Sequence, residues 1–234
     1  MRSVFESTIV KIKVGKPSVD FHVHKDLLCH YSSYFRAALN SGFKEGIDDK
    51  VVLQEDDAAV FKVLVHFLYT GNIYENDVDL KSKNKAHAAE RQMPLVRLWV
   101  MGDKRGIPAL QNRVLNAFHQ TFLHAWSFSP TVLSYLYDNT SGPGLCRSLV
   151  VEFYAQIGTN KSLPNWTPSP SKEFLMELCD RHNDLIYVDR NYPDTKAFWR
   201  DIDLCRFHIH DDKDCKGRDV TKDVSAADKE TSKS

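Results

Sequence analysis

The sequence predicts an α+β fold in which a small sheet is flanked by helical hairpins, followed by an all-helical C-terminal region. Three observations support this prediction. Apolar residues alternate with polar ones near the N-terminus, the period lengthens to that of amphipathic helices from Leu27, and only helical spacing recurs after Phe122. The chain is therefore divided into an α+β domain over 1–122, a helical region over 123–204, and a Cys/His segment with a polar tail over 205–234.

The first strands and helices follow from short-range patterns. Val10, Ile12 and Val14 alternate with lysines, and the alternation resumes over Phe21–Val23, so these two strands are expected to pair as a hairpin. A helical turn then begins near Leu27, and Ser32 or Ser33 is the expected N-cap of a second one. Val51–Leu53 is a third, short strand.

Capping residues delimit the helices that follow. Asp56 or Asp57 is the expected N-cap of a helix that ends at Thr70-Gly71. The polar stretch 75–92 begins as a loop and becomes the lead-in to a helix. The next helix pair is marked by an apolar restart at Leu95, a C-terminal glycine at Gly106 and a first-turn proline at Pro108.

The second half shows three further helical patterns. Ser129-Pro130 opens one that ends near Asp138, residues 145–157 form another, and Ser169-Pro170 opens a third. Residues 216–234 carry both charges, have no aromatic residue and are poor in apolar groups, so a disordered tail is expected there.

Composition argues against two classes of partner. The chain has 234 residues with 42% hydrophobic and 26% charged residues, which is typical of globular proteins. Lys+Arg and Asp+Glu both number 31, so the net charge is zero. Binding to nucleic acid or anionic lipid depends largely on basic side chains that displace counterions. We therefore expect neither a nucleic-acid nor a membrane partner, and we interpret the lysines at 81–85 as part of a solvated connection.

The cysteines and the hydropathy pattern predict an intracellular protein, cytoplasmic or nuclear. Five cysteines are scattered along the chain, an odd number that indicates free thiols. The opening MRSVFESTIV has no uninterrupted apolar stretch of signal-peptide length, and no segment approaches the roughly 20 apolar residues of a membrane helix.

Several motifs, in a fixed order, resemble those of BTB/POZ domains. The resemblance covers roughly the first half of the chain and implies the BTB/POZ fold. Its motifs are Phe21-x-Val23-His24-Lys25-x-Leu27-Leu28, Ser32-x-Tyr34-Phe35, Phe43-x-Glu45, Val51-Val52-Leu53, Phe61 leading to Phe67-Leu68-Tyr69-Thr70-Gly71, and Leu98 through Gly102-Asp103-Lys104 to Gly106-Ile107-Pro108-x-Leu110.

The same resemblance implies a partner-binding site at Phe43, Lys44 and Glu45. BTB domains that recruit cullin-type ubiquitin ligase scaffolds carry a hydrophobic-x-Glu motif at the equivalent loop. There the apolar residue enters a cleft on the scaffold's first helical repeat, and the glutamate shapes the turn. Phe43 is either such an anchor or a side chain that folds back beneath Leu39 onto its own domain.

Self-association is left open by the resemblance. Many BTB dimers exchange a strand and a helix that precede the equivalent of Val10, and this sequence has only Met1 to Ile9 there. The expectation is therefore a monomer or a homo-oligomer with a smaller interface.

No motif indicates catalysis, and the chain is predicted not to be an enzyme. His22, His24 and Asp26 lie close together, but no nucleophile is near them in sequence, and Ser32 and Ser33 are expected as cap residues. The sequence contains neither G-x-S-x-G, nor G-x-x-x-x-G-K-[ST], nor H-E-x-x-H.

One segment near the C-terminus has the residue types of a zinc site. Cys205, His208, His210 and Cys215 provide four zinc-competent ligands, and Cys179-x2-His182 lies upstream. The spacing fits no common zinc finger, however, and three nearby aspartates would also suit a solvated turn. The sequence alone leads us to assign no metal and no cofactor.

These observations favour a non-catalytic protein–protein interaction module, with a substrate adaptor for a cullin-based ubiquitin ligase as the leading hypothesis and an unknown client as second partner. The alternative is a self-associating scaffold or a transcription-linked adaptor with no ubiquitin role. The sequence shows neither DNA-binding zinc fingers, which disfavours the transcription-linked version, nor β-propeller repeats, which disfavours the standard adaptor.

Overall fold

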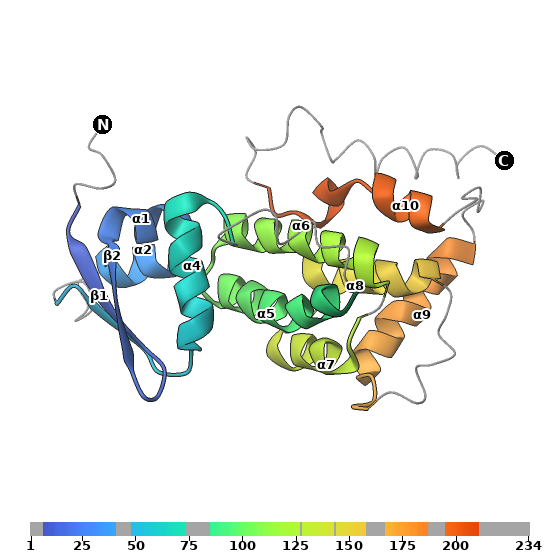
Figure 1. Ribbon diagram of the computed structural model, residues 1–234, viewed down its shortest axis with the longest axis horizontal. Helices are drawn as coiled ribbons and strands as arrows, with labels where there is room; N and C mark the ends of the chain where they lie inside the picture. Colours follow the sequence, from blue (N-terminus) through green and yellow to red (C-terminus); the bar gives the residue numbers. More distant parts are fainter. Residues whose placement is uncertain are drawn as a thin grey trace.

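The computed structural model describes residues 7–40, 48–73, 85–126, 128–142, 144–157, 167–186 and 195–210. A small sheet lies at one end of the molecule and the helices extend away from it (Figure 1). The predicted fold class is confirmed: a small sheet with helices is followed by a helical C-terminal region.

The sheet has the strand order β2-β1-β3, in which β1 (Ile9–Val14) is antiparallel to β2 (Val19–His24) and parallel to β3 (Lys50–Leu53). Val10 pairs with Val23, and Ile12 with Phe21, so the predicted hairpin is confirmed. Val10 and Ile12 are fully buried, whereas the alternate residue Lys11 forms an ion pair with Asp20 at 2.6 Å on the outer face. Alternation thus assigns one face to the core and the other to solvent.

Helices α1 (Lys25–Tyr31) and α2 (Ser33–Asn40) form a hairpin fixed by Ser32. The Ser32 hydroxyl accepts a hydrogen bond from the Phe35 backbone N–H at 3.0 Å, which confirms the predicted cap. The same hydroxyl donates to the Arg105 carbonyl, and Ser33 N–H donates to the Gly106 carbonyl. Gly106 has φ +57°, and a Cβ there would lie 2.0 Å from the Ser33 Oγ, so a larger residue would be strained and would displace the Ser33 hydroxyl.

Helix α4 (Ala58–Thr70) is capped at both ends as expected. The Asp57 carboxylate accepts hydrogen bonds from the backbone N–H groups of Ala59 and Val60, and Gly71 ends the helix at φ +72°. Asp56, the other candidate cap, instead forms an ion pair with Arg105 at 2.6 Å. This pair connects the start of α4 to the end of α5.

Helices α5 (Lys85–Lys104) and α6 (Pro108–Ala125) are the central pair. The predicted first-turn proline Pro108 is confirmed, but α5 begins well before the apolar restart at Leu95 and contains Pro94. Gln92, which lies in the polar stretch, is fully buried, and its Oε1 accepts the Ser129 N–H at 3.0 Å. This hydrogen bond fixes the start of the next helix.

The described part of the C-terminal region contains helices joined by short non-helical segments. Its elements are α7 (Pro130–Asn139), α8 (Leu145–Ile157), α9 (Lys172–Ile186), α10 (Thr195–Asp201) and the 3₁₀ turn η4 (Leu204–Phe207). Helix α9 begins two residues after Pro170, because the Ser171 hydroxyl, not Ser169, accepts the Phe174 N–H at 3.2 Å. No helix in the described part of the chain combines the length and the apolar character needed to cross a membrane.

One continuous core connects the sheet to the C-terminal helices. Its buried residues run from Val10 to Phe207, and Phe122 of α6 stacks on Phe153 of α8 at 4.4 Å between ring centroids. The predicted boundary after residue 122 lies within α6. The domain limits 1–122, 123–204 and 205–234 stay predictions.

Candidate functional site

The predicted partner-binding residues Phe43, Lys44 and Glu45 lie outside the described residues. They connect Asn40, where α2 ends, to Asp48, where the description resumes before β3. Both alternatives for Phe43, an anchor for a partner or a side chain covered by its own domain, stay predictions. The two ends of the connection are described and define where it leaves and rejoins the fold.

The upstream end is held by the α1–α2 hairpin. Phe35 and Leu39 on α2 are buried in the core. On the opposite side, the Arg36 guanidinium donates to the carbonyl oxygens of Cys29 at 2.9 Å and His30 at 3.2 Å. These contacts fix the helix from which the connection starts.

The downstream end is held by Asp49. Its carbonyl accepts the Lys11 N–H at 3.0 Å, and its carboxylate forms an ion pair with Lys25 at 2.9 Å. Asp49 has φ +45°, a left-handed conformation that aspartate tolerates better than most residues. Lys25 begins α1 and Lys11 lies on β1. Asp49 therefore joins the sheet to the α1–α2 hairpin at the point where the connection returns.

Of the two histidines near the start of α1, one is exposed and the other is bonded to a tyrosine. His22 is exposed on the outer face of the sheet, and the His24 ring bonds through Nδ1 to the Tyr69 hydroxyl at 2.7 Å. Asp26 uses its backbone N–H, which donates to the Ser7 hydroxyl at 3.1 Å. The contact between His24 and Tyr69 joins β2 to the end of α4.

A groove between α4 and α5 was not predicted from the sequence. It has a volume of about 320 Å³, and its lining is mostly apolar. The apolar lining residues are Ala59, Val60, Val63, Ile73, Met93, Pro94, Leu95 and Leu98. Pro94 is the one sequence signal that could have indicated an irregular helix surface here. The groove has the chemistry to accept an apolar side chain.

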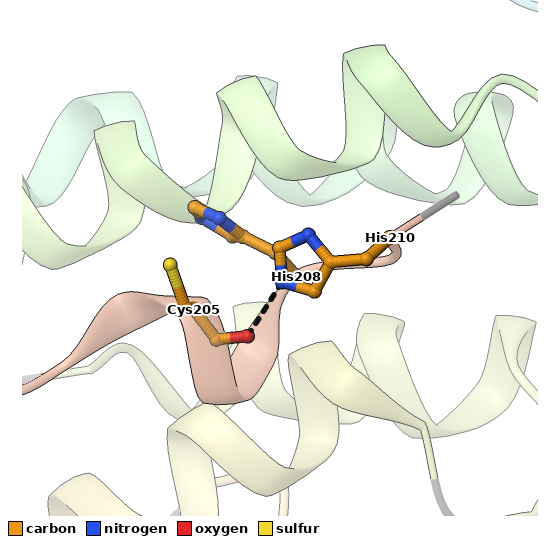
Figure 2. Close-up of side chains that lie close together, drawn as sticks. All are labelled: Cys205, His208 and His210. Carbon is orange, nitrogen blue, oxygen red and sulfur yellow. Dashed lines mark hydrogen bonds between the residues drawn. The ribbon is translucent and has the colours of Figure 1, made fainter. Parts of the chain in front are cut away.

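The structure brings three of the four candidate zinc ligands together. One ligand atom each from Cys205, His208 and His210 lie within 4.8 Å of one another (Figure 2). Cys215 lies outside the described residues, and the group does not include Cys179 or His182. All three side chains are half-buried, on η4 and the residues that follow it.

Hydrogen bonds orient both rings of this group. The His208 Nε2 bonds to the Asn116 Oδ1 at 2.9 Å, and the His210 Nε2 bonds to the Cys205 carbonyl oxygen at 2.9 Å, the dashed contact in Figure 2. Burial lowers the pKa of His208, and the neighbouring His210 lowers it further, while Asp203 acts in the opposite sense. The neutral imidazole, the form that binds metals, is therefore favoured at His208.

Comparison with known proteins assigns the first part of the chain to a family. The model of the BTB/POZ domain matches residues 6–90, which run from before β1 into the start of α5 and include Phe43, Lys44 and Glu45. Helices α6 to α10 and η4 lie beyond the match.

Curated relatives match over a similar short stretch. The human "Kelch repeat and BTB domain-containing protein 2" is 41% identical over 58 residues, 25% of this chain and 9% of that protein. From Danio rerio, "Kelch-like protein 21" is 39% identical over 66 residues and "Kelch-like protein 40b" is 35% identical over 65 residues. These matches cover 27% and 28% of this chain, and 11% and 10% of the relatives. The chain thus matches about a tenth of each relative's length.

Proposed function

Because residues 6–90 of this chain are a BTB/POZ domain, we propose that the protein is a non-catalytic adaptor that joins a cullin-type ubiquitin ligase scaffold to a client protein. The BTB/POZ domain binds the scaffold through Phe43, Lys44 and Glu45. The helical region after it binds the client. The observation that carries the proposal is the family match, since its residues include the hydrophobic-x-Glu motif.

The two anchored ends of the docking connection support this assignment. Asn40 follows a helix packed into the core, and Asp49 is bonded to both Lys11 and Lys25. The residues on both sides of the motif are therefore held by the domain itself, so they lose little conformational entropy when a partner binds.

The proposed client surface lies on α9, at the other end of the molecule from the sheet. Leu175 and Met176 are exposed there by 40% and 56%. Large apolar side chains that neighbour each other on a helix surface favour contact with another protein. Helix α9 is outside the family match, as expected for a region that varies with the client.

The alternative function is a self-associating scaffold with no ubiquitin role. One observation favours it: Ile9 and Val52 are exposed by 57% and 49%, and both lie on the outer face of the sheet. An interface between two copies on this face would bury them. The experiment on Phe43 therefore includes a measurement of oligomeric state.

The proposal is tested with Phe43→Ala, using affinity purification of the full chain from its native cell. We expect a cullin and its ring-finger subunit in the wild-type sample and their loss from the variant, because the truncated side chain no longer fills the scaffold's cleft. The melting temperature is expected to stay unchanged. Met176→Ala removes a large, exposed apolar side chain from α9 and is the control that keeps the scaffold.

Two results would contradict the adaptor proposal. One is a lower melting temperature of Phe43→Ala with undiminished cullin capture, which places the ring in the protein's own core. The other is a wild-type sample that contains no cullin and elutes as an oligomer in light-scattering chromatography, which supports the scaffold alternative.

A further inference from the structure

We propose that Cys205, His208 and His210 form a Zn²⁺ site, in which the Cys205 Sγ and the Nδ1 atoms of both imidazoles are the ligands. This site lies on the segment after α10 and uses none of the proposed docking residues. It therefore goes beyond the proposed adaptor function and does not depend on it.

The separations within the group are close to those of a metal site. The Cys205 Sγ and one ring nitrogen from each of His208 and His210 lie within 4.8 Å of one another. With Zn–S of about 2.3 Å and Zn–N of about 2.0 Å, neighbouring ligands of a tetrahedral ion lie roughly 3.3–3.6 Å apart. The ligand atoms therefore have to approach by no more than about 1.5 Å, a movement that side-chain rotations provide.

The backbone that carries the ligands is fixed from α6 and from the start of η4. Asn112 on α6 binds Ile209 twice: its Nδ2 donates to the Ile209 carbonyl and its Oδ1 accepts the Ile209 N–H, both at 2.7 Å. The Asp203 carboxylate accepts the Cys205 N–H at 3.1 Å. Phe207, between the ligands, is buried in the core. These contacts fix the backbone positions of Cys205, His208 and His210 relative to one another.

Both rings make the outer contact that ligand histidines make in metal sites. A ring that donates from Nε2 carries its lone pair on Nδ1. His208 reaches the Asn116 amide oxygen, and His210 reaches the Cys205 carbonyl oxygen, through Nε2 in each case. Each oxygen is an acceptor, so both rings are held in the tautomer whose Nδ1 binds a cation.

The donor set identifies the class of ion. One thiolate and two imidazoles suit a borderline-soft ion such as Zn²⁺, whereas Mg²⁺ and Ca²⁺ require oxygen ligands. The three side chains are half-buried, which allows an ion to enter. Three protein ligands leave the fourth position of a tetrahedral ion for water or another donor.

The ion would attach the end of the helical region to its core. The site lies between Phe207, which is buried, and Asn116 of α6. An ion that binds only the native arrangement stabilises it against unfolding. The consequence is a melting temperature that depends on metal.

The test uses the full chain, purified without a metal-affinity tag and without chelator. Metal content, the thiolate-to-Co²⁺ charge-transfer band after Co²⁺ addition, and the melting temperature with and without EDTA are measured for four proteins. Cys205→Ser removes the thiolate, and His208→Gln removes the imidazole but keeps an N–H for Asn116. Cys179→Ser, an exposed cysteine outside the group, is the matched control beside the wild type.

We expect one zinc per chain, a Co²⁺ band and a fall in melting temperature on EDTA addition for the wild type and Cys179→Ser. Cys205→Ser and His208→Gln are expected to lose at least nine-tenths of the zinc and to show no EDTA effect. The band is absent without the thiolate. Wild-type protein with neither zinc nor a Co²⁺ band would overturn the proposal, as would undiminished zinc in Cys205→Ser. A folded His208→Gln, checked by circular dichroism, that retains zinc would overturn the role of His208.

Discussion

At the scale of single residues, His119 shows how position decides charge. Its side chain lies on α6 among buried residues, and its Nε2 donates to the Trp199 carbonyl oxygen on α10. Burial lowers the pKa of this imidazole, and the hydrogen bond to Trp199 only partly offsets the effect. The folded protein therefore favours neutral His119 under conditions in which an exposed histidine would already be protonated.

This shift predicts that the stability falls as the pH falls below about 6.5, the ordinary pKa of histidine. In that range the unfolded chain binds a proton at His119 that the folded protein excludes, so the free energy of unfolding decreases. His119→Gln keeps an N–H donor for the Trp199 carbonyl but does not titrate. Urea unfolding between pH 5 and 7 should therefore give a shallower pH slope for the variant.

His208 is the internal reference for this experiment, because its pKa is lowered in the same sense and both proteins contain it. Only the difference between the two slopes reports on His119. Identical slopes for the wild type and His119→Gln would show that His119 does not contribute to the pH dependence.

At the scale of elements, two ion pairs join α8 to α9: Arg147 with Glu177 at 3.5 Å, and the closer pair of Arg181 with Glu152. The Glu152 carboxylate on α8 is 4% exposed, and the Arg181 guanidinium on α9 binds its two oxygens through Nε and Nη2. The hydrogen bond to Glu152 raises the pKa of Arg181. Gln156 donates to the same carboxylate at 2.9 Å. The contact is bidentate, which is the geometry in which arginine binds a carboxylate most specifically.

Removing Arg181 should be costly because it leaves a buried carboxylate without its counter-charge. We expect Arg181→Met to lower the free energy of unfolding by about 3 kcal/mol in urea denaturation. Arg181→Met combined with Glu152→Leu should lose less than the sum of the single changes, since the buried charge is then gone.

The matched control for this cycle is an exposed pair. Arg200 and Asp201 on α10 are 69% and 73% exposed, and Arg200→Met should cost less than about 0.5 kcal/mol. Equal effects of the Arg181 and Arg200 variants, or strict additivity in the double variant, would contradict the assignment of the Arg181–Glu152 pair as a stabilising contact.

At the scale of the whole molecule, α6 belongs to both halves of the fold. Its Phe122 ring lies 5.6 Å from Phe128, 4.4 Å from Phe153 and 6.0 Å from Trp199, measured between ring centroids. All three partners follow residue 122. Trp199 is fully buried, and it reaches this cluster from α10. The core of the α+β part thus continues into the helical region without a gap.

A fragment of residues 1–122 should consequently be much less stable than the full chain. It ends within α6 and exposes Phe122, whose burial contributes about 2–3 kcal/mol, together with the neighbouring Phe118. We expect a lower urea midpoint and binding of a hydrophobic dye, compared with the full chain at equal concentration. A fragment as stable as the full chain would instead show that the two regions are independent domains.

The sequence alone determined the elements whose causes are local. Alternation at Val10, Ile12 and Val14 and the helix end at Gly71 were predictable, because each depends on residues within a few positions. Each cap was predicted to within two residues, Ser32 or Ser33 and Asp56 or Asp57, and the structure has Ser32 and Asp57. The order of these signals also carried the resemblance to BTB/POZ domains. It placed a docking motif at Phe43, Lys44 and Glu45, whose role stays a prediction.

The tertiary structure decided what depends on distant parts of the chain. Polar Gln92 is buried because it meets Ser129, and Trp199 is buried because α10 packs on α6. The spacing of Cys205, His208 and His210 permitted a metal site, but the contacts with Asn112 and Asn116 that hold this segment on α6 are formed only in the tertiary structure. Periodicity tells which face of a helix is apolar, whereas the choice of partner depends on how all the faces fit together.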